Sequence, residues 1–196
     1  KHAFAYPSGM GATAAALGIL KEGETLLLGM PSYGGTYRFA TIELPARGVK
    51  TRFIGDFTAL TDEDFTDNVT MVFLESPSNP LLRVSDIAAI AEIAHRNGAI
   101  VVVDNTFMTP LLQKPLDLGA DISVQSATKY LGGHGTSIGG VIVDSGNFDY
   151  GADPEKFPKF NQPAPGYHGL VYARDLGKDS AFGANLSYIL KARVSL

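Results

Sequence analysis

Short apolar runs, separated by polar and glycine-rich segments, make up most of this chain. Runs with the length of buried strands lie at residues 25–28, 49–54, 70–75, 100–104, 122–124 and 140–143. Between two of these runs, Ile87, Ile90 and Ala94 recur at the spacing of one helix face, which predicts a helix over residues 86–96 with Gly98 as its C-cap. Nearly unbroken apolar strands joined by a helix are typical of a parallel sheet covered on both faces. The pattern therefore predicts an α/β fold whose mainly parallel sheet is sandwiched by helices.

Three further helices are predicted, and they lie at residues 9–21, 37–47 and 181–196. The first is rich in alanine and follows Ser8, a good N-cap. The regular pattern of predicted strands and helices ends at residue 151, where a proline-rich, irregular stretch begins. We expect residues 1–150 to form the core of a ligand-binding domain. Residues 151–196 are expected to be this proline-rich stretch and a helix without a C-cap, which suggests that the chain stops inside a larger architecture.

The composition narrows the class of function. The chain has 196 residues and a formal net charge of −4, from 16 Lys and Arg against 20 Asp and Glu, so no basic excess favours nucleic acid or an anionic membrane as a partner. It has no Cys, which excludes disulfides and thiolate chemistry. No apolar stretch is long enough to span a bilayer, and His, Asp and Glu show no metal-ligand spacing. The sequence therefore predicts a cytoplasmic protein without a membrane segment or a metal site.

Unusual residues follow the predicted strands. Ligands of open α/β sheets bind beyond the carboxyl ends of the strands. Tyr33 follows the first strand, Glu75 and Asn79 lie at and after the third, Asp104 ends the fourth, and residues 126–129 follow the fifth. We therefore expect these residues to converge on one crevice.

Lys129 and Asp104 are the two residues that could define the chemistry of this crevice. A lysine after a strand is usually a surface amine, but a desolvated lysine with a lowered pKa can form a Schiff base with a carbonyl group. A carboxylate at the end of an apolar strand either caps the following turn or pairs with a cation. Pyridoxal phosphate needs a lysine for its aldehyde and an acidic partner that keeps its ring nitrogen protonated. The pair therefore points to that cofactor.

Small residues at two places could hold the phosphate of such a cofactor. Gly9 and Met10 stand at a helix start, where unpaired N–H groups and the positive end of the helix favour an anion. A helix start of this kind is, by itself, more often plain packing. Ser126 and Thr128 are two residues apart on the way to Lys129, and in an extended segment both would point to one side, as a phosphate clamp requires.

For three other residues, the sequence allows two different roles. Tyr33 could stack on an aromatic cofactor or pack at the rim of the sheet. Asn79, between prolines, could hydrogen-bond a cofactor ring oxygen or be an ordinary turn residue. His134, in a glycine-rich loop, is more often structural than a catalytic base, and we leave it out of the site.

Five motifs taken together resemble the Cys/Met-metabolism family of pyridoxal-phosphate enzymes. They are Ser-Gly-Met-Gly at residues 8–11, Tyr-Gly-Gly-Thr at 33–36, Glu-Ser-Pro-Ser-Asn-Pro at 75–80, Val-Asp-Asn-Thr-Phe at 103–107, and Ser-Ala-Thr-Lys-Tyr-Leu-Gly-Gly-His at 126–134. The resemblance implies the large domain of the aspartate-aminotransferase-like fold, with pyridoxal 5'-phosphate as cofactor and a small-molecule amino acid as substrate. It also implies a homo-oligomer, a tetramer built from dimers that share active sites. Under this resemblance, residues 151–196 would be an insertion and a helix that lead toward a C-terminal domain absent from this chain.

The resemblance also implies roles for the residues that match these motifs. Lys129 would be the Schiff-base lysine and proton shuttle, and Asp104 would pair with the pyridinium nitrogen. Tyr33 would stack on the ring and assist proton transfer, and Asn79 would lie near the ring hydroxyl or the substrate carboxylate. The phosphate would be held by Gly9, Met10, Ser126 and Thr128.

Members of the family run different reactions. Residues 133–144 and the insertion that reaches residues 167–172 resemble O-acetylhomoserine sulfhydrylases, whereas residues 8–11 and 75–80 are more similar to the lyase branch. We give the insertion more weight, which favours γ-replacement: sulfide or a small thiol would replace the acetate of O-acetylhomoserine, giving homocysteine or methionine. The alternatives are γ-elimination from methionine or cystathionine, a cystathionine γ-synthase, and a non-catalytic module that uses the same surface for partner contacts.

Overall fold

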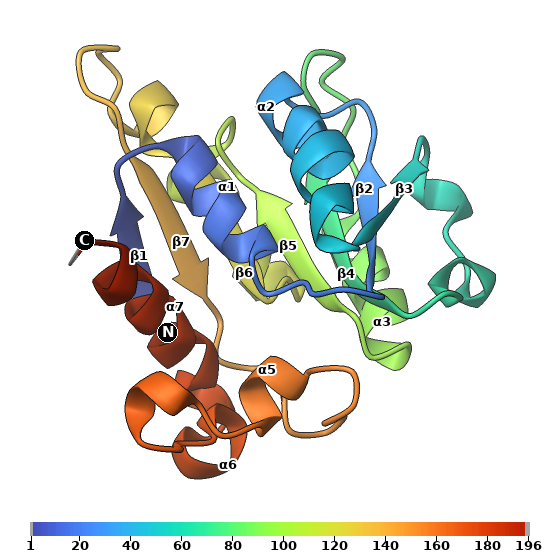
Figure 1. Cartoon of the computed structure of the whole chain (residues 1–196). Helices are drawn as coiled ribbons and strands as arrows, with labels where there is room; N and C mark the ends of the chain where they lie inside the picture. The colour runs from blue at the N-terminus through green and yellow to red at the C-terminus, as the bar shows by residue number, and fades with distance from the viewer. Residues whose placement is uncertain (1, 195–196) are drawn as a thin grey trace.

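The computed structural model describes residues 2–194, and side chains up to residue 186, around one seven-stranded sheet (Figure 1). Its strands are β1 His2–Tyr6, β2 Thr25–Gly29, β3 Lys50–Ile54, β4 Val69–Glu75, β5 Ile100–Asp104, β6 Ile122–Ser126 and β7 Gly140–Asp144. Their spatial order is β1-β7-β6-β5-β4-β2-β3. The row from β6 to β3 is parallel throughout, whereas β7 is antiparallel to both β6 and β1. The predicted α/β class with a mainly parallel sheet is confirmed.

One end of the sheet differs from the sequence prediction. The strand predicted over residues 140–143 is β7, but it does not extend the parallel pattern. Residues 127–139 form a turn and a loop without a crossover helix, so the chain returns along β6 in the opposite direction. β1 was not predicted, because it is a largely exposed edge strand whose partner β7 is remote in sequence. Side-chain patterns along the chain carry no information on such a pairing.

The helices are α1 Gly9–Leu17, α2 Gly34–Arg38, α3 Ile87–Arg96, α4 Thr109–Leu112, α5 Pro158–Asn161, α6 Tyr172–Leu176 and α7 Lys178–Val194. The predicted helix over residues 86–96 is found as α3. Asp86 is its N-cap, and Gly98 follows the C-cap Asn97 in the left-handed conformation that favours glycine. Within residues 2–194, no helix has the length and hydropathy needed to cross a bilayer.

The three other predicted helices have different bounds. α1 begins after the predicted N-cap Ser8 but ends at Leu17, before residue 21, because the chain continues into tighter turns after Gly18. The helix predicted over residues 37–47 is replaced by α2, a π-helical stretch and a short 3-10 turn that begins at Pro45, which has no N–H for a regular helix. The final helix, predicted to start at residue 181, is α7 and starts earlier. Its predicted last residues, 195–196, lie outside the described residues.

Alternate residues of the central strands pack against two separate layers of helices. Leu26 and Leu28 of β2 lie in a core with α1 and α7, whereas Leu27 between them packs in a second core with α3. In β5, Val102 belongs to the first core and Val103 to the second. Because successive strand residues point to opposite faces, α1 and α3 cover opposite sides of the sheet (Figure 1). Apolar residues on both faces explain the unbroken apolar runs in the sequence.

The proline-rich segment after β7 has definite partners in the first core. Tyr150 is buried and stacks on Phe160, with 4.0 Å between the ring centroids. The Nζ of Lys156 donates to the C-cap carbonyl of α3 at 2.7 Å, and that of Lys159 to the C-cap carbonyl of α1 at 3.0 Å. Cations at helix C-termini are favourable because the last carbonyl groups have no partner within the helix. These contacts fix residues 150–160 against both helical layers.

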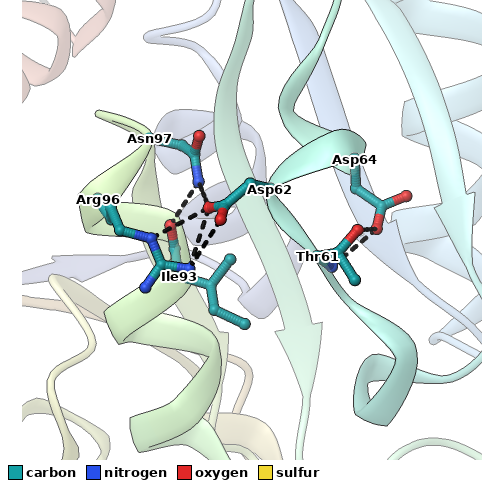
Figure 2. Close-up of polar contacts among 6 residues, drawn as sticks. All are labelled: Thr61, Asp62, Asp64, Ile93, Arg96 and Asn97. Atoms are coloured by element: carbon teal, nitrogen blue, oxygen red, sulfur yellow. Dashed lines mark hydrogen bonds and ion pairs between the residues drawn. The ribbon is translucent and has the colours of Figure 1, made fainter.

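A polar cluster holds the loop before β4 to the end of α3 (Figure 2). The guanidinium of Arg96 forms two parallel hydrogen bonds with the carboxylate of Asp62, each 3.1 Å long. The side-chain amide of Asn97 donates to the same carboxylate at 2.6 Å and to the carbonyl of Ile93 at 3.0 Å. Hydrogen bonds from Asn97 and Arg96 lower the pKa of Asp62. The cluster lies at the amino-terminal edge of the sheet, because α3 ends just before β5 begins.

Two glycines allow the start of α1 to contact the ends of two strands. A Cβ atom at Gly9 would lie 2.6 Å from the Cβ of Ser126, and one at Gly140 would overlap the carbonyl oxygen of Ser8. The Ser8 hydroxyl accepts the N–H of Gly11 at 3.0 Å, which fixes the first turn of the helix in this position. The missing side chains therefore bring a helix start, the end of β6 and the start of β7 into direct contact.

We expect Gly140→Ala to lower the free energy of unfolding by about 2 kcal/mol or more, because backbone atoms of Ser8 and Gly9 would have to move. Urea unfolding, compared with Gly55→Ala, measures the effect. Gly55 is the matched control because no atom lies within 4 Å of a Cβ built there. Equal stability of the two variants would contradict the close approach.

The pair of His95 and Asp121 makes stability depend on pH. The ring Nε2 of His95 lies 2.9 Å from Oδ2 of the buried Asp121, and this hydrogen bond raises the pKa of the histidine. The folded-state pKa therefore exceeds the unfolded value of about 6.5. The contribution of the pair is fully present below that unfolded value and is lost as the pH rises through the folded value.

We expect His95→Gln to destabilise the protein more at pH 5.5 than at pH 8.5. Urea unfolding of the wild type and the variant at both pH values measures this difference. His134→Gln is the control, since His134 is exposed and its Nδ1 lies 2.8 Å from the nearby carbonyl of Gly132. If the effect of His95→Gln on the free energy of unfolding were independent of pH, the ion pair would not contribute to stability.

Candidate active site

A cavity of about 360 Å³ opens at the edge of the sheet where the parallel strands end. The eight residues that the sequence predicts for the site all line it: Gly9, Met10, Tyr33, Asn79, Asp104, Ser126, Thr128 and Lys129. They come from the start of α1, from the last residues of β5 and β6, and from the segments after β2, β4 and β6. The structure therefore brings all eight together.

The register of the sheet explains this convergence. Glu75 at the end of β4 is paired in register with Asp104 at the end of β5. On the other side of β6, Ser126 stands opposite Gly140, and Gly140 stands opposite Tyr6 of β1, two residues before Ser8. Because parallel strands present their carboxyl ends at one edge, residues from five separate sequence motifs reach the same cavity.

Asp104 is held by the turn that follows it. Its Oδ1 accepts hydrogen bonds from the backbone N–H of Thr106 at 2.9 Å and from the Thr106 hydroxyl at 2.5 Å. The turn cap that the sequence allowed as one interpretation is thus present. Burial raises the pKa of Asp104, and the two hydrogen bonds from Thr106 oppose that rise. A cationic group in the cavity would favour the ionised form of this carboxyl.

Thr106 was not predicted as a site residue. Its hydroxyl donates to Asp104 and also accepts the backbone N–H of Ser126 at 2.8 Å. One side chain therefore couples the carboxylate at the end of β5 to the end of β6. A hydroxyl two residues after a strand-end carboxylate is a local signal for the first bond. The second bond joins residues distant in sequence and has no local signal.

Glu75 is a second residue outside the predicted site set. It is 8% exposed, its Oε1 accepts the backbone N–H of Tyr33 at 2.6 Å, and its Oε2 accepts that of Asn79 at 3.2 Å. Burial raises its pKa to about 7, and the neighbouring carboxyl of Asp104 adds to the rise. The sequence showed Glu75 as a strand-end carboxylate, but its contacts with two loops required the fold.

Lys129 lies in a π-helical turn rather than at the end of an extended segment. Residues Ala127–Leu131 form a helical turn after β6, closed by a 2.8 Å hydrogen bond from the N–H of Gly132 to the carbonyl of Ala127. Lys129 lines the cavity but is exposed, so residues 2–186 do not supply the desolvation considered from the sequence.

The expected extended arrangement of Ser126 and Thr128 is wrong, because the chain turns between them. Ser126 ends β6, whereas Thr128 lies in the helical turn that follows. The Thr128 hydroxyl accepts the N–H of Gly139 at 3.1 Å and lies 3.2 Å from its carbonyl oxygen. Thr128 therefore anchors the glycine-rich loop to the turn that carries Lys129, in addition to lining the cavity.

The start of α1 forms another wall of the cavity. The amides of Gly9 and Met10 precede the first hydrogen bond within the helix, so they are donors without an acceptor in the helix itself. Tyr33 is 43% exposed, and a Cβ at Gly35 would lie between its ring and the sulfur of Met10. An aromatic ring, helix N–H groups, the Ser126 hydroxyl and a carboxylate thus surround one space of ligand size.

The sequence matches the family model for the Cys/Met metabolism PLP-dependent enzymes over residues 1–187. The chain belongs to this family. A homocysteine synthase of Schizosaccharomyces pombe is 43% identical over 97% of the chain, and a cystathionine beta-lyase of Coxiella burnetii is 46% identical over 75%. The solved structure of an O-acetylhomoserine sulfhydrylase from Wolinella succinogenes superposes with a TM-score of 0.77 at 32% identity, covering 94% of the chain.

The chain spans less than half the length of these relatives. It covers 44% of the S. pombe protein, 38% of the C. burnetii protein and 49% of the W. succinogenes chain. The family membership agrees with the resemblance found in the motifs, and the superposition agrees with the predicted large domain. Among residues 2–194, no group of three or more His, Cys, Asp or Glu is placed to hold a metal ion.

We expect Thr106→Val to lower the free energy of unfolding by about 1–3 kcal/mol, because it removes one donor from Asp104 and the acceptor of the Ser126 N–H. Thr106→Ser keeps the hydroxyl and serves as the control. Thermal unfolding of both variants measures the difference. If the valine variant were as stable as the serine variant, the hydroxyl would not couple the two strand ends.

Proposed function

We propose that the protein to which this chain belongs is a pyridoxal-phosphate-dependent γ-replacement enzyme. It would act on an O-acylated homoserine and replace the acyl group with sulfide or a small thiol, giving homocysteine or methionine. The observation that carries this proposal is the convergence of Lys129, Asp104 and the Gly9 helix start on one cavity. These are the amine, the carboxylate and the anion-binding donors that the cofactor needs.

The residues of the cavity fit pyridoxal phosphate. The volume of about 360 Å³ lies within the ordinary range of ligand sites. The amides of Gly9 and Met10, with the hydroxyls of Ser126 and Thr128, would hold the phosphate. The contact between Gly9 and Ser126 is so close that no side chain fits at residue 9, which keeps the backbone accessible to an anion. Burial of Asp104 makes a cationic partner favourable, as a protonated ring nitrogen would be.

The remaining residues would orient the ring and move protons. When bound, the cofactor supplies an electron sink that makes the α and β positions of the substrate acidic. Lys129 would hold the cofactor through Nζ, and the same atom would move protons at the substrate. Tyr33 would stack on the ring and assist proton transfer. The side-chain amide of Asn79 would bind the ring hydroxyl or the substrate carboxylate.

Relatives favour replacement over elimination. The S. pombe protein is named a homocysteine synthase and the W. succinogenes structure is that of an O-acetylhomoserine sulfhydrylase, and both comparisons cover more than nine-tenths of this chain. The C. burnetii lyase has a higher identity, 46%, but over only 75% of the chain. Elimination from methionine or cystathionine is therefore the second candidate.

We propose that the intact protein has a further domain and forms a tetramer. Residues 151–196 would lead from the cofactor-binding core, residues 1–150, into a further domain of the intact protein. Subunits would pair so that each completes the active site of its neighbour, with two such dimers in a tetramer. The intact enzyme would work in the cytoplasm on a small-molecule amino acid.

We expect the intact protein to show the visible absorption band of lysine-bound pyridoxal phosphate and to form homocysteine from O-acetylhomoserine and sulfide. Lys129→Ala should lose the band and reduce turnover by on the order of 1,000-fold or more. Lys50→Ala is the control, because Lys50 is an exposed lysine at the start of β3, outside the cavity.

Two results would contradict this assignment. Release of 2-oxobutyrate from methionine without homocysteine formation from O-acetylhomoserine would favour elimination. A wild-type protein without the absorption band would favour the non-catalytic alternative.

A further inference from the structure

Glu75 makes contacts that none of the proposed catalytic steps requires. It is the last residue of β4, and its two carboxylate oxygens accept hydrogen bonds from two different loops. One loop follows β2 and begins the turn with Tyr33, and the other follows β4 and carries Asn79. A single side chain thus fixes the backbone of Tyr33 and Asn79, two of the residues that would contact the cofactor ring.

The two hydrogen bonds use separate oxygens, and this matters for substitution. Oε1 accepts from Tyr33 and Oε2 from Asn79. A carboxylate is an acceptor at both ends, whereas glutamine presents a donor at one of them. Only an acidic side chain of this length satisfies both N–H groups together.

The surroundings of Glu75 disfavour the ionised form of its carboxyl group. Glu75 is buried, its register partner is Asp104, and it makes no ion pair with any of the side chains described through residue 186. Burial and the neighbouring carboxyl of Asp104 both disfavour the ionised form of Glu75 and raise its pKa. A buried group with such a cost and without a charged partner is more typical of a functional site than of a packing position.

Glu75 also lines two cavities. One is the cavity of about 360 Å³, and the other, of about 660 Å³, lies between the ends of β2 and β3 and the start of α3. Glu75 therefore borders both cavities while it bonds the loops of Tyr33 and Asn79. A shift of Glu75 would move both loops relative to Asp104.

We propose that Glu75 is a positioning residue of the cofactor site, which holds the Tyr33 and Asn79 loops at the geometry that the ring requires. The proposal rests on the proposed function for the identity of the ligand, but the two hydrogen bonds are properties of the apoprotein. Glu75 itself does not touch the reacting atoms in this assignment. Its effect reaches them through the ring of Tyr33 and the side chain of Asn79.

The first test uses the intact apoprotein and needs no cofactor. In Glu75→Gln we expect the amide hydrogens of residues 33 and 79 to exchange faster with deuterium, at one of them by about tenfold or more, because one N–H then faces a donor. The matched control is Glu24→Gln. Glu24 is 3% exposed, it accepts the backbone N–H of Lys21 at 3.0 Å, and it precedes β2 at the opposite edge of the sheet.

The second test measures cofactor binding in the intact protein. We expect Glu75→Gln to raise the dissociation constant of pyridoxal phosphate by about tenfold and to reduce the visible circular dichroism of the bound cofactor, since the ring loses its fixed orientation. Glu24→Gln should leave both unchanged. A variant that fails to fold is replaced by Glu75→Asp, which keeps the charge but is too short to reach both N–H groups.

The outcomes separate the two proposals. Unchanged exchange at residues 33 and 79 would overturn the role of Glu75, and so would faster exchange with wild-type affinity and dichroism. Equal changes in Glu24→Gln would also overturn it, because the effect would then come from lost stability alone. A wild-type protein that takes up no pyridoxal phosphate would overturn the proposed function, and the exchange result would still decide whether Glu75 holds the two loops.

Discussion

The contact between the start of α1 and the ends of β6 and β7 is the constraint on which the site depends. Gly9 lies against Ser126 and Gly140 lies against Ser8, with no space for a side chain at either glycine. This contact places the N–H groups of a helix start beside the hydroxyl that ends β6. It also sets the position of the turn that follows β6 and carries Lys129. A shift at this junction would therefore separate the anion-binding groups from the lysine.

The second organising feature is a pair of carboxyls at the ends of adjacent strands, the buried Glu75 and the partly buried Asp104. Asp104 and Glu75 are paired in register, and neither is neutralised by a basic side chain among the ion pairs of the described part of the chain. Each instead accepts two hydrogen bonds, Asp104 from Thr106 and Glu75 from two loops. Burial raises the pKa of both carboxyls and these hydrogen bonds oppose the rise, so a cation beside them would favour their ionised forms. Such an arrangement suits a cationic ring whose protonated state has to be preserved.

Much of this site could be predicted from local sequence. Lys129, Asp104, Gly9 and Ser126 each follow or precede an apolar run, and the rule that parallel strands end at one edge was enough to group them. The prediction for Thr128 was less successful, because it assumed that the chain stays extended after β6. The chain turns there, and the Thr128 hydroxyl bonds to Gly139, a contact that depends on the path of the glycine-rich loop.

The sequence by itself determined the periodic features: buried strands, the amphipathic α3, the N-cap of α1 and the motifs that place the chain in its family. These depend on neighbours within a few residues, so the pattern of side chains is sufficient to specify them. Only the tertiary structure decided the direction of β7, the existence of β1, and the bonds of Thr106 and Glu75 to distant backbone groups. These depend on which strands pair and at which register. That choice is made by burial across the whole sheet, which no local segment of sequence contains.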